Sequence, residues 1–208
     1  MKGKFITFEG CEGVGKSTQI RLLQEYFRNN NIKAVFTREP GGVRICETIR
    51  GVILNKEFTE MSPICESMLY AASRAQLVGE VIVPALNAGK IVLCDRYVDS
   101  SYAYQGYARG IGIDKIEEIN SVATIGAIPD LTIFLDLSPR EAFRRKGGRD
   151  SNDRMENEKI EFHEKVYLGY KAVAERYPDR VVSICPRGSK IETHQAIIKV
   201  LKEKGIIE

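Results

Sequence analysis

One glycine-rich segment, Gly10-Cys11-Glu12-Gly13-Val14-Gly15-Lys16-Ser17, constrains the fold of this chain more than any other feature. It matches G-x-x-x-x-G-K-[ST] at every fixed position, between a strand-like run at residues 4–9 and a helix-like run at residues 17–28. Glycines let the backbone curl until successive N–H groups point at one phosphate, and the following helix N-terminus adds partial positive charge. The segment, with Thr18 beyond it, therefore predicts a nucleoside triphosphate site. We expect Lys16 to reach the β- and γ-phosphates and Ser17 to ligate Mg²⁺.

Strand-like and helix-like segments alternate along the whole chain. Runs of apolar and β-branched residues bounded by turn residues predict strands at residues 4–9, 34–37, 90–94, 131–137 and 181–185. Helical periodicity and helix-start signals predict helices at residues 17–28, 62–87, 154–176 and 192–204 and from residues 114 and 138. The alternation predicts an α/β fold, with a five-stranded parallel sheet and helices on both faces. No repeat or linker interrupts it, so we expect one domain over residues 1–208.

Three of these helices have a specific start signal. Asp114 with Glu117 resembles a capping box. Ser62 and Ser138 each precede a proline, which suits the first position of a helix.

The charge balance gives no sign of a nucleic-acid-binding surface. The 31 basic and 28 acidic residues leave a net charge of +3. No apolar run approaches the ~20 residues of a membrane span, and the N-terminus has no signal-peptide pattern. We therefore expect a cytoplasmic protein with no membrane or nucleic-acid partner. The five cysteines show no C-x-x-C spacing, which predicts free buried thiols.

The phosphate-binding loop alone leaves kinases, ATPases and GTPases open. A GTPase needs an N-K-x-D loop to read guanine, whereas the nearest string, residues 55–58 (NKEF), ends in phenylalanine. A motor or DNA-processing ATPase would usually be larger or carry a nucleic-acid face. A kinase for a small acceptor needs a second anion site, an acid near the metal and a mobile basic lid. The sequence offers a candidate for each.

The lid candidate is the basic stretch at residues 140–154, in which Gly147-Gly148 supplies a hinge. A solvated basic helix end is the alternative interpretation. Asp95 directly follows an apolar strand and can hold Mg²⁺ or its water, and Arg96 can bridge donor and acceptor phosphates. Asp136 follows another strand similarly, so strand position alone does not choose between the two acids, and either could be a cap or turn residue.

Six strings occur together in the order and at the spacing of one family. They are FEGCEGVGKSTQ (8–19), TREPGG (37–42), LYAASRAQL (69–77), CDRYVDSSYAYQG (94–106), PDLTIFLDLSP (129–139) and NDRMENE (152–158). Jointly they resemble the thymidylate kinases of bacterial type. The resemblance implies a P-loop NTPase fold with an Arg-rich lid, a homodimer, and phosphoryl transfer from ATP to thymidine monophosphate (dTMP). The product, dTDP, would serve dTTP synthesis and DNA replication.

The resemblance also implies residue roles at the acceptor's phosphate and sugar. Arg38 and Arg96 would hold the 5′-phosphate. Glu12 and Glu9 would face the 3′-hydroxyl and the metal region, where Glu9 joins Ser17 and Asp95. Lys16, Arg96 and Glu12 would form the catalytic set together with a lid arginine.

At the base, the family's motifs match five residues. Arg74 would hydrogen-bond the thymine carbonyl edge, and Ser101 would read the N3 side. Tyr104 would crowd the 2′ position, and Gln105 would lie near the base or sugar. Tyr70 stands where the family usually has a stacking phenylalanine, so its hydroxyl needs a partner.

In the lid, the resemblance makes Arg149 the catalytic arginine, helped by Arg145 and Arg154. Gly13-Val14 in the loop together with Arg149 resembles the group of the family that carries its arginines in the lid. Cys185-Pro186 replaces the family's usual Asp-Ala pair near the adenine, which leaves Arg187 as the candidate adenine contact. The Glu39-Pro40 bond is expected to be cis.

Two alternatives stay open from the residues alone. One is a kinase for another acceptor, such as a different nucleoside monophosphate or a deoxynucleoside. The other is a nucleotide-dependent switch or partner-binding ATPase without transfer activity.

Overall fold

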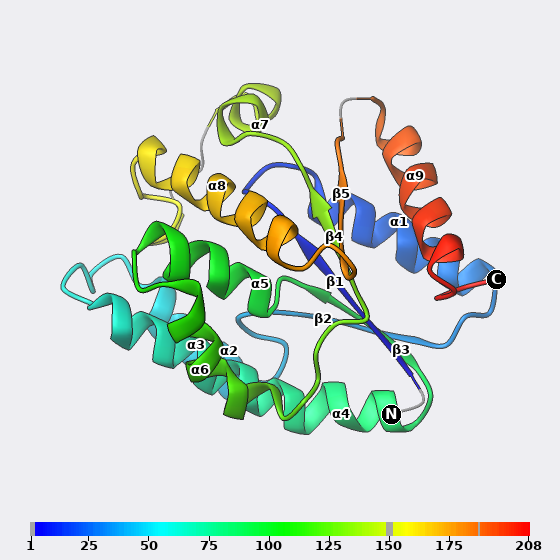
Figure 1. Cartoon of the computed structure of the whole chain (residues 1–208), viewed down its shortest axis with the longest axis horizontal. Coiled ribbons are helices and arrows are strands. Elements are labelled where there is room, and N and C mark those ends of the chain that lie inside the picture. The colour runs from blue at the N-terminus through cyan, green and yellow to red at the C-terminus, as the bar shows by residue number, and fades with distance from the viewer. Residues whose placement is uncertain (1–2, 149–151, 187) are drawn as a thin grey trace.

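A parallel five-stranded β-sheet forms the centre of the computed structural model, which describes residues 3–148, 152–186 and 188–208 (Figure 1). The strands are β1 (Lys4–Glu9), β2 (Ala34–Arg38), β3 (Ile91–Asp95), β4 (Leu131–Leu135) and β5 (Val181–Ile184). Within the described chain their order is β2-β3-β1-β4-β5, and every pairing is parallel. All carboxyl ends therefore meet at one edge of the sheet, where ligands of open α/β sheets bind.

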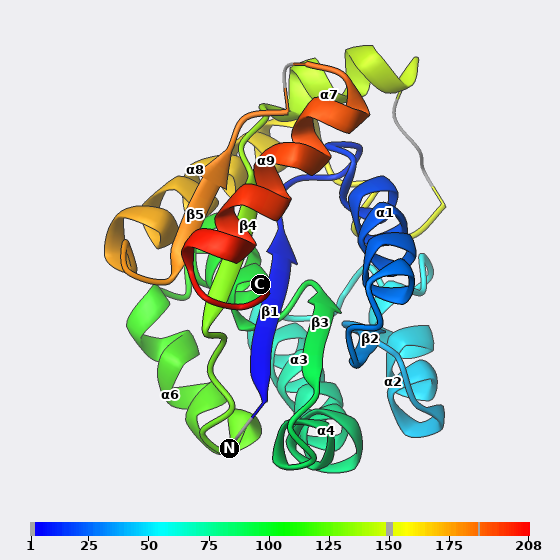
Figure 2. The ribbon, with the colours of Figure 1, turned by 90° about the vertical axis from the view of Figure 1, so that its right-hand side faces the viewer.

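Helices cover both faces of the sheet. Figures 1 and 2 show α1 and α9 together on one face, with α3, α5 and α8 on the other. The α-helices are α1 (Lys16–Asn29), α2 (Arg44–Leu54), α3 (Pro63–Leu77), α4 (Val83–Asn87), α5 (Val98–Ser101), α6 (Ile113–Thr124), α7 (Pro139–Lys146), α8 (Ile160–Arg176) and α9 (Lys190–Glu203). Two π-helical segments, η1 (Val78–Ile82) and η2 (Tyr102–Ala108), lie among them. The α/β class predicted from the alternation is confirmed.

The core follows from the strand sequences. All five residues of β4 (LTIFL) are buried, as a strand covered on both faces requires. Cys11, Cys46 and Cys94 are buried and free, which confirms part of the cysteine prediction. The prediction was wrong for Cys65 and Cys185, which are free but exposed.

Three helix predictions need correction. The predicted helix at residues 154–176 begins only at Ile160, because the Asp153 carboxylate accepts the backbone N–H groups of Met155 and Glu156 and holds a turn there. Asp114 forms no capping box, since α6 is preceded by Gly112 with φ 96° and has no side-chain cap. The predicted run at residues 62–87 is helical but is interrupted by η1.

Other signals were correct. Ser62 caps α3 by accepting the Cys65 N–H, and Ser138 caps α7 by accepting the Glu141 N–H. The helical turns of α5 and η2, which follow β3, were not predicted. No helix within the described residues is long and apolar enough to cross a membrane.

Candidate active site

The loop between β1 and α1 has the backbone that its glycines predict. Gly10, Gly13 and Gly15 adopt positive φ angles of 135°, 73° and 103°. A Cβ on Gly10 would lie 2.9 Å from the Leu135 carbonyl oxygen, so this position excludes a side chain for lack of space as well as for backbone strain. The Cys11 and Val14 side chains are buried in the core. The loop can therefore offer a phosphate its backbone N–H groups and the positive end of α1.

Lys16 bends back over this loop. Its ammonium donates to the carbonyl oxygens of Gly10 at 2.9 Å and Cys11 at 2.8 Å. Burial, and then the neighbouring Arg96, lowers the pKa of Lys16 to about 8, while Asp95 opposes both effects. An anion that binds at this loop would therefore face the Lys16 ammonium, which hydrogen bonds to two carbonyl oxygens hold in place.

Two cavities meet at the carboxyl edge of the sheet. We call the one of about 500 Å³ over the loop the phosphate cavity, lined by Glu12, Gly13, Gly15, Lys16, Ser17, Thr18, Arg38, Glu39, Arg50, Asp95, Arg96, Lys146 and Glu156. The acceptor cavity, of about 180 Å³, is lined by Glu12, Glu39, Pro40, Arg50, Leu54, Tyr70, Arg74, Arg96, Tyr97, Ser100, Ser101, Tyr104, Gln105, Asp153, Met155, Glu156 and His163. Glu12, Glu39, Arg50, Arg96 and Glu156 line both cavities, so the two share a wall.

The phosphate cavity distinguishes the two candidate acids. Asp136 accepts the Tyr167 hydroxyl at 2.8 Å and the Lys171 ammonium at 3.0 Å, and it lies outside the lining. Asp95 lines the cavity, and its buried Oδ1 has no hydrogen-bond partner among the described residues. An unpaired buried carboxylate oxygen on a residue that lines the same cavity as Ser17 fits a Mg²⁺ ion that keeps several waters. No cluster of three or more His, Cys, Asp or Glu side chains that could hold a metal occurs in the described ranges.

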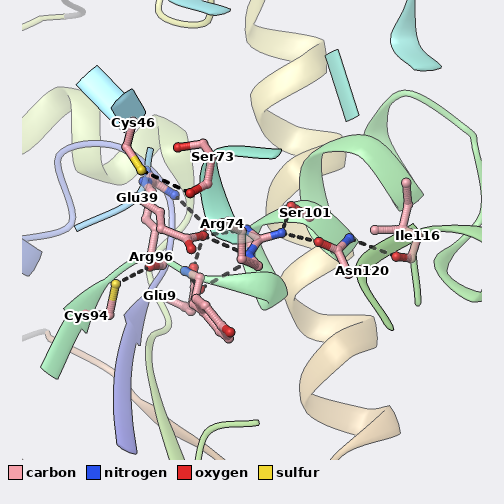
Figure 3. Close-up of polar contacts among 12 residues, drawn as sticks. Glu9, Glu39, Cys46, Ser73, Arg74, Cys94, Arg96, Ser101, Ile116 and Asn120 are labelled. Atoms are coloured by element: carbon pink, nitrogen blue, oxygen red, sulfur yellow. Dashed lines mark hydrogen bonds and ion pairs between the residues drawn. The ribbon is translucent and has the colours of Figure 1, made fainter. Parts of the chain in front are cut away.

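Arg74 forms the polar back of the acceptor cavity (Figure 3). It is 1% exposed and donates to Glu39 Oε2 from Nε at 2.9 Å and from Nη2 at 2.6 Å. Its Nη1 donates to the Ser101 hydroxyl at 3.1 Å and to the Asn120 side-chain oxygen. Burial raises the pKa of Glu39 to about 7, and Arg74 opposes that rise. The Glu39-Pro40 bond is cis, as expected.

Arg96 lies between the two cavities. Its backbone is left-handed, with φ 67°, and its N–H donates to the Phe8 carbonyl. Nη1 donates to the Tyr170 hydroxyl at 2.8 Å and to Ser100 Oγ at 3.3 Å, and the guanidinium lies 5.4 Å from the Tyr104 ring centroid. A guanidinium fixed in this way can face groups in both cavities.

Arg50 is the cation that the sequence reasoning missed. It lies on α2, lines both cavities and donates to the Pro40 carbonyl at 2.9 Å. Arg38 lines the phosphate cavity alone and pairs with Glu47 at 2.7 Å. No signal in a single sequence singles out Arg50, because an arginine on an amphipathic helix is an ordinary surface residue.

Glu9 is placed differently from its expected role. Its side chain is fully buried and lines neither cavity of the described structure. The carboxylate accepts the N–H groups of Tyr97 and Ser100 and the hydroxyls of Ser100 and Tyr170. Burial, and then Asp99, raises the pKa of Glu9 to about 7. This geometry holds the Ser100–Tyr170 pair that contacts Arg96, and metal ligation by Glu9 stays a prediction.

The other predicted acceptor residues lie together. Tyr70, Tyr104 and Gln105 line the acceptor cavity, although they come from α3 and η2. The Tyr70 hydroxyl has no hydrogen-bond partner among the described residues.

Glu12 lines both cavities and pairs with Lys146 of α7 at 3.1 Å.

The lid candidate is described only in part, since Arg149 lies outside the described residues, and so does Arg187, the candidate adenine contact. Gly147 ends α7 with a left-handed backbone at φ 85°. Arg145 donates to the Pro186 carbonyl, beside the expected adenine position, and pairs with Glu141 at 3.0 Å. Arg154 pairs with Glu66 at 2.7 Å.

Comparison with known proteins agrees with this geometry. The family model described as thymidylate kinase matches residues 8–197. The thymidylate kinase of Thermoanaerobacter sp. (strain X514) is 49% identical over 203 residues, covering 98% of this chain and 99% of the relative. The thymidylate kinase of Clostridium novyi (strain NT) is 46% identical over 210 residues, covering 100% and 99%. The crystal structure of thymidylate kinase from Ehrlichia chaffeensis superposes with a TM-score of 0.76 at 32% identity, covering 97% and 99%. The chain therefore belongs to the thymidylate kinase family, with its P-loop α/β fold and its phosphotransferase activity.

Proposed function

We propose that this chain transfers the γ-phosphoryl group of ATP to the 5′-phosphate of dTMP and releases ADP and dTDP. The shared wall of the two cavities carries the proposal. A phosphate-binding loop lies in one cavity and a polar, aromatic pocket in the other, while Arg50 and Arg96 line both. If one nucleotide bound in each cavity, the phosphates of the two nucleotides would face each other at this shared wall.

On the donor side, the loop N–H groups and Lys16 would hold the β- and γ-phosphates of ATP. Ser17 and Asp95 would hold Mg²⁺, which would neutralise phosphate charge when bound. Arg145 and Arg187 would lie towards the adenine. Lys16 must leave its two carbonyl partners to reach the phosphates, so ATP has to displace these internal hydrogen bonds.

On the acceptor side, Arg96 and Arg50 would hold the 5′-phosphate, with Arg38 at the phosphate-cavity end. Guanidinium groups suit this task because their planar fork binds phosphate oxygens bidentately. Glu12 would accept a hydrogen bond from the 3′-hydroxyl of the deoxyribose. Tyr104 would leave no room for a 2′-hydroxyl and so would exclude ribonucleotides.

The base would lie deeper in the acceptor cavity. Tyr70 would stack on thymine. Arg74, Ser101 and Gln105 would meet its polar edge. Since Glu39, Ser101 and Asn120 already hold Arg74, its remaining N–H would be aimed at the base before dTMP arrives.

Transfer needs no covalent intermediate. Positioning and charge neutralisation by Lys16, Arg96, Arg149 and Glu12 would carry the rate. We further propose that the protein is a homodimer and acts in the cytoplasm, where both nucleotides are available. Sedimentation equilibrium would test the dimer, which should have twice the 23.4 kDa of one chain.

The deciding experiment measures ADP release from ATP and Mg²⁺ with each deoxy- and ribonucleoside monophosphate in turn. We expect strong stimulation by dTMP, weaker stimulation by deoxyuridine monophosphate and negligible stimulation by uridine monophosphate. Preference for another monophosphate would discard the base-site roles and retain the phosphate chemistry. ATP hydrolysis that no acceptor increases would favour a switch ATPase instead.

The role of Arg149 makes a separate prediction. Arg149→Ala should lower kcat by about 10³-fold or more, in line with arginines that stabilise transferring phosphoryl groups, and should leave dTMP affinity nearly unchanged. Steady-state kinetics and calorimetry measure the two quantities. The matched control is Arg140→Ala on α7, an exposed arginine paired with Glu164. An equal loss of dTMP binding in Arg149→Ala would contradict the role.

A further inference from the structure

Glu66 of α3 joins three parts of the chain through one buried carboxylate. Its side chain is 1% exposed. The carboxylate accepts from Gln105 Nε2 at 2.8 Å, from Arg109 Nε at 3.3 Å and Nη2 at 3.1 Å, and pairs with Arg154 Nη2 at 2.7 Å. Gln105 belongs to η2 and lines the acceptor cavity, whereas Arg154 belongs to the segment that returns from the lid candidate.

Arg154 extends the connection to α2. Its backbone N–H donates to the Leu54 carbonyl at 3.1 Å, and its Nε donates to the Ile53 carbonyl at 2.9 Å. The returning segment is thus attached at Glu66 and at the last residues of α2.

This segment is also a wall of the acceptor cavity. Asp153, Met155 and Glu156 line the cavity on either side of Arg154. Arg109 reinforces the wall, because its Nη1 pairs with Glu158 at 2.6 Å and its guanidinium lies 4.3 Å from the Phe162 ring centroid. The position of the wall therefore depends on charges that meet at Glu66.

The charges at this point are matched and shielded from water. Although burial alone would raise it, the pKa of Glu66 is lowered, because Arg109, the Gln105 hydrogen bond and Arg154 favour the carboxylate. Removing one partner of a buried pair leaves the other charge without compensation, which is far more costly than loss of an exposed pair.

We propose that Glu66 is a positioning residue that fixes the segment returning from the lid against the base end of the acceptor cavity, so that dTMP affinity depends on the Glu66–Arg154 pair. The inference rests on the proposed function, since it assigns the base of dTMP to this cavity. Glu66 itself need not touch the nucleotide: it acts through Arg154, Arg109 and Gln105.

The test is a double-mutant cycle on dTMP binding, measured by calorimetry without ATP so that chemistry does not enter. Glu66→Gln keeps an oxygen that can accept from Gln105, removes the charge that faces the arginines and puts an NH2 donor in place of the other oxygen. We expect Glu66→Gln and Arg154→Gln each to weaken dTMP binding about 10- to 100-fold, because each breaks a buried ion pair and leaves the other charge uncompensated. The double variant should be no weaker than the worse single variant, because both changes remove the same pair.

Steady-state kinetics supply a readout that general damage would not produce. KM for dTMP should rise in Glu66→Gln, while KM for ATP stays within about twofold, as expected for loss of acceptor binding alone. Glu164→Gln is the matched control, since it removes the carboxylate charge of an exposed pair between α8 and Arg140 of α7. It should leave both constants unchanged.

Other outcomes would overturn the proposal. Lower unfolding free energy with unchanged dTMP affinity, or equal losses for dTMP and ATP, would make Glu66 purely structural. Should Glu66→Gln fail to fold, Arg154→Gln decides by the same KM comparison. Wild-type activity with dTMP, measured first, separates failure of this inference from failure of the proposed function.

Discussion

The ammonium of Lys16 couples ATP binding to pH. Its pKa of about 8 lies below the ordinary value of 10.5, so the free protein loses this charge as pH rises through 8. Bound triphosphate would favour the charged form and raise the pKa again. We expect ATP affinity to fall between pH 7.5 and about 9.5, with proton uptake on binding that grows over the same range. Calorimetry in buffers of different ionisation enthalpy measures both quantities.

Binding of dTMP is the control for this prediction. Arginines, which stay charged at these pH values, dominate the acceptor side. The affinity for dTMP should therefore vary little between pH 7.5 and 9.5. An equal decline for both nucleotides would point to general unfolding or to another titrating group, and would contradict the assignment to Lys16.

Asp99 of α5 makes a prediction about stability. Its fully buried carboxylate accepts from Arg180 at 2.7 Å through both Nη atoms and from the Thr132 hydroxyl at 2.8 Å. Asp99→Ala would leave the Arg180 charge partly buried and uncompensated. The free energy of unfolding in urea should fall by about 3–5 kcal/mol. Asp114→Ala, which breaks an exposed pair with Arg176, should change it by less than about 1 kcal/mol.

Residues differ in how far the sequence can predict them. Lys16 and Ser17 follow from local spacing, because one loop and one helix place them. Tyr104 and Gln105 were expected only through resemblance to a family, since no local pattern distinguishes them from core residues. Glu66 and Arg50 could not be predicted, because their importance comes from segments far away in the chain.

At the level of secondary-structure elements, sequence patterns predicted the strands and helix starts that depend on neighbouring residues. The strands and the Ser62 and Ser138 caps depend on composition and neighbouring residues, and they were predicted correctly. η2 is different: its π-helical turns pack on α8, and that tertiary contact is invisible to local propensity. The late start of α8 likewise reflects a side-chain turn at Asp153 that competes with the helix.

The cap of α3 is testable because this helix carries Glu66, Tyr70 and Arg74. Ser62→Ala removes the oxygen that accepts the Cys65 N–H at 3.2 Å. We expect the free energy of unfolding to fall by about 1 kcal/mol, with little change in dTMP affinity, because only the first turn loosens. Ser121→Ala is the control, since its hydroxyl donates to the Glu118 carbonyl within α6 and caps no helix N-terminus in the described chain. A Ser62→Ala protein as stable as the wild type would contradict the capping role.

At the scale of the whole molecule, the carboxyl edge of the parallel sheet brings together segments from residue 12 to residue 163 around two adjoining cavities. The parallel sheet with helices on both faces could be predicted from alternation alone. The shared wall could not, because it needs the positions of α2 and of the segment around Arg154, which only tertiary packing determines.

The cysteines predict how the folded molecule reacts with a thiol reagent. Cys65 and Cys185 are exposed and should react within the dead time of manual mixing. Cys11, Cys46 and Cys94 should react only on local opening, since burial raises their pKa values, that of Cys11 to about 12. Mass spectrometry of digested samples gives each rate. Labelling of the three buried thiols as fast as the two exposed ones would contradict the burial described above.

The places of these three thiols give them a further use. Cys11 lies in the phosphate loop, Cys46 donates to the Ser73 carbonyl of α3 from α2, and Cys94 lies in strand β3 (Figure 3). Each would report opening of a different region, without any probe being introduced. If ATP slows the labelling of Cys11 only and dTMP slows the labelling of Cys46 only, each nucleotide rigidifies only the region around its own cavity. If ATP or dTMP alone slows the labelling of both Cys11 and Cys46, the two regions become ordered together. The first nucleotide to bind would then lower the ordering cost for the second.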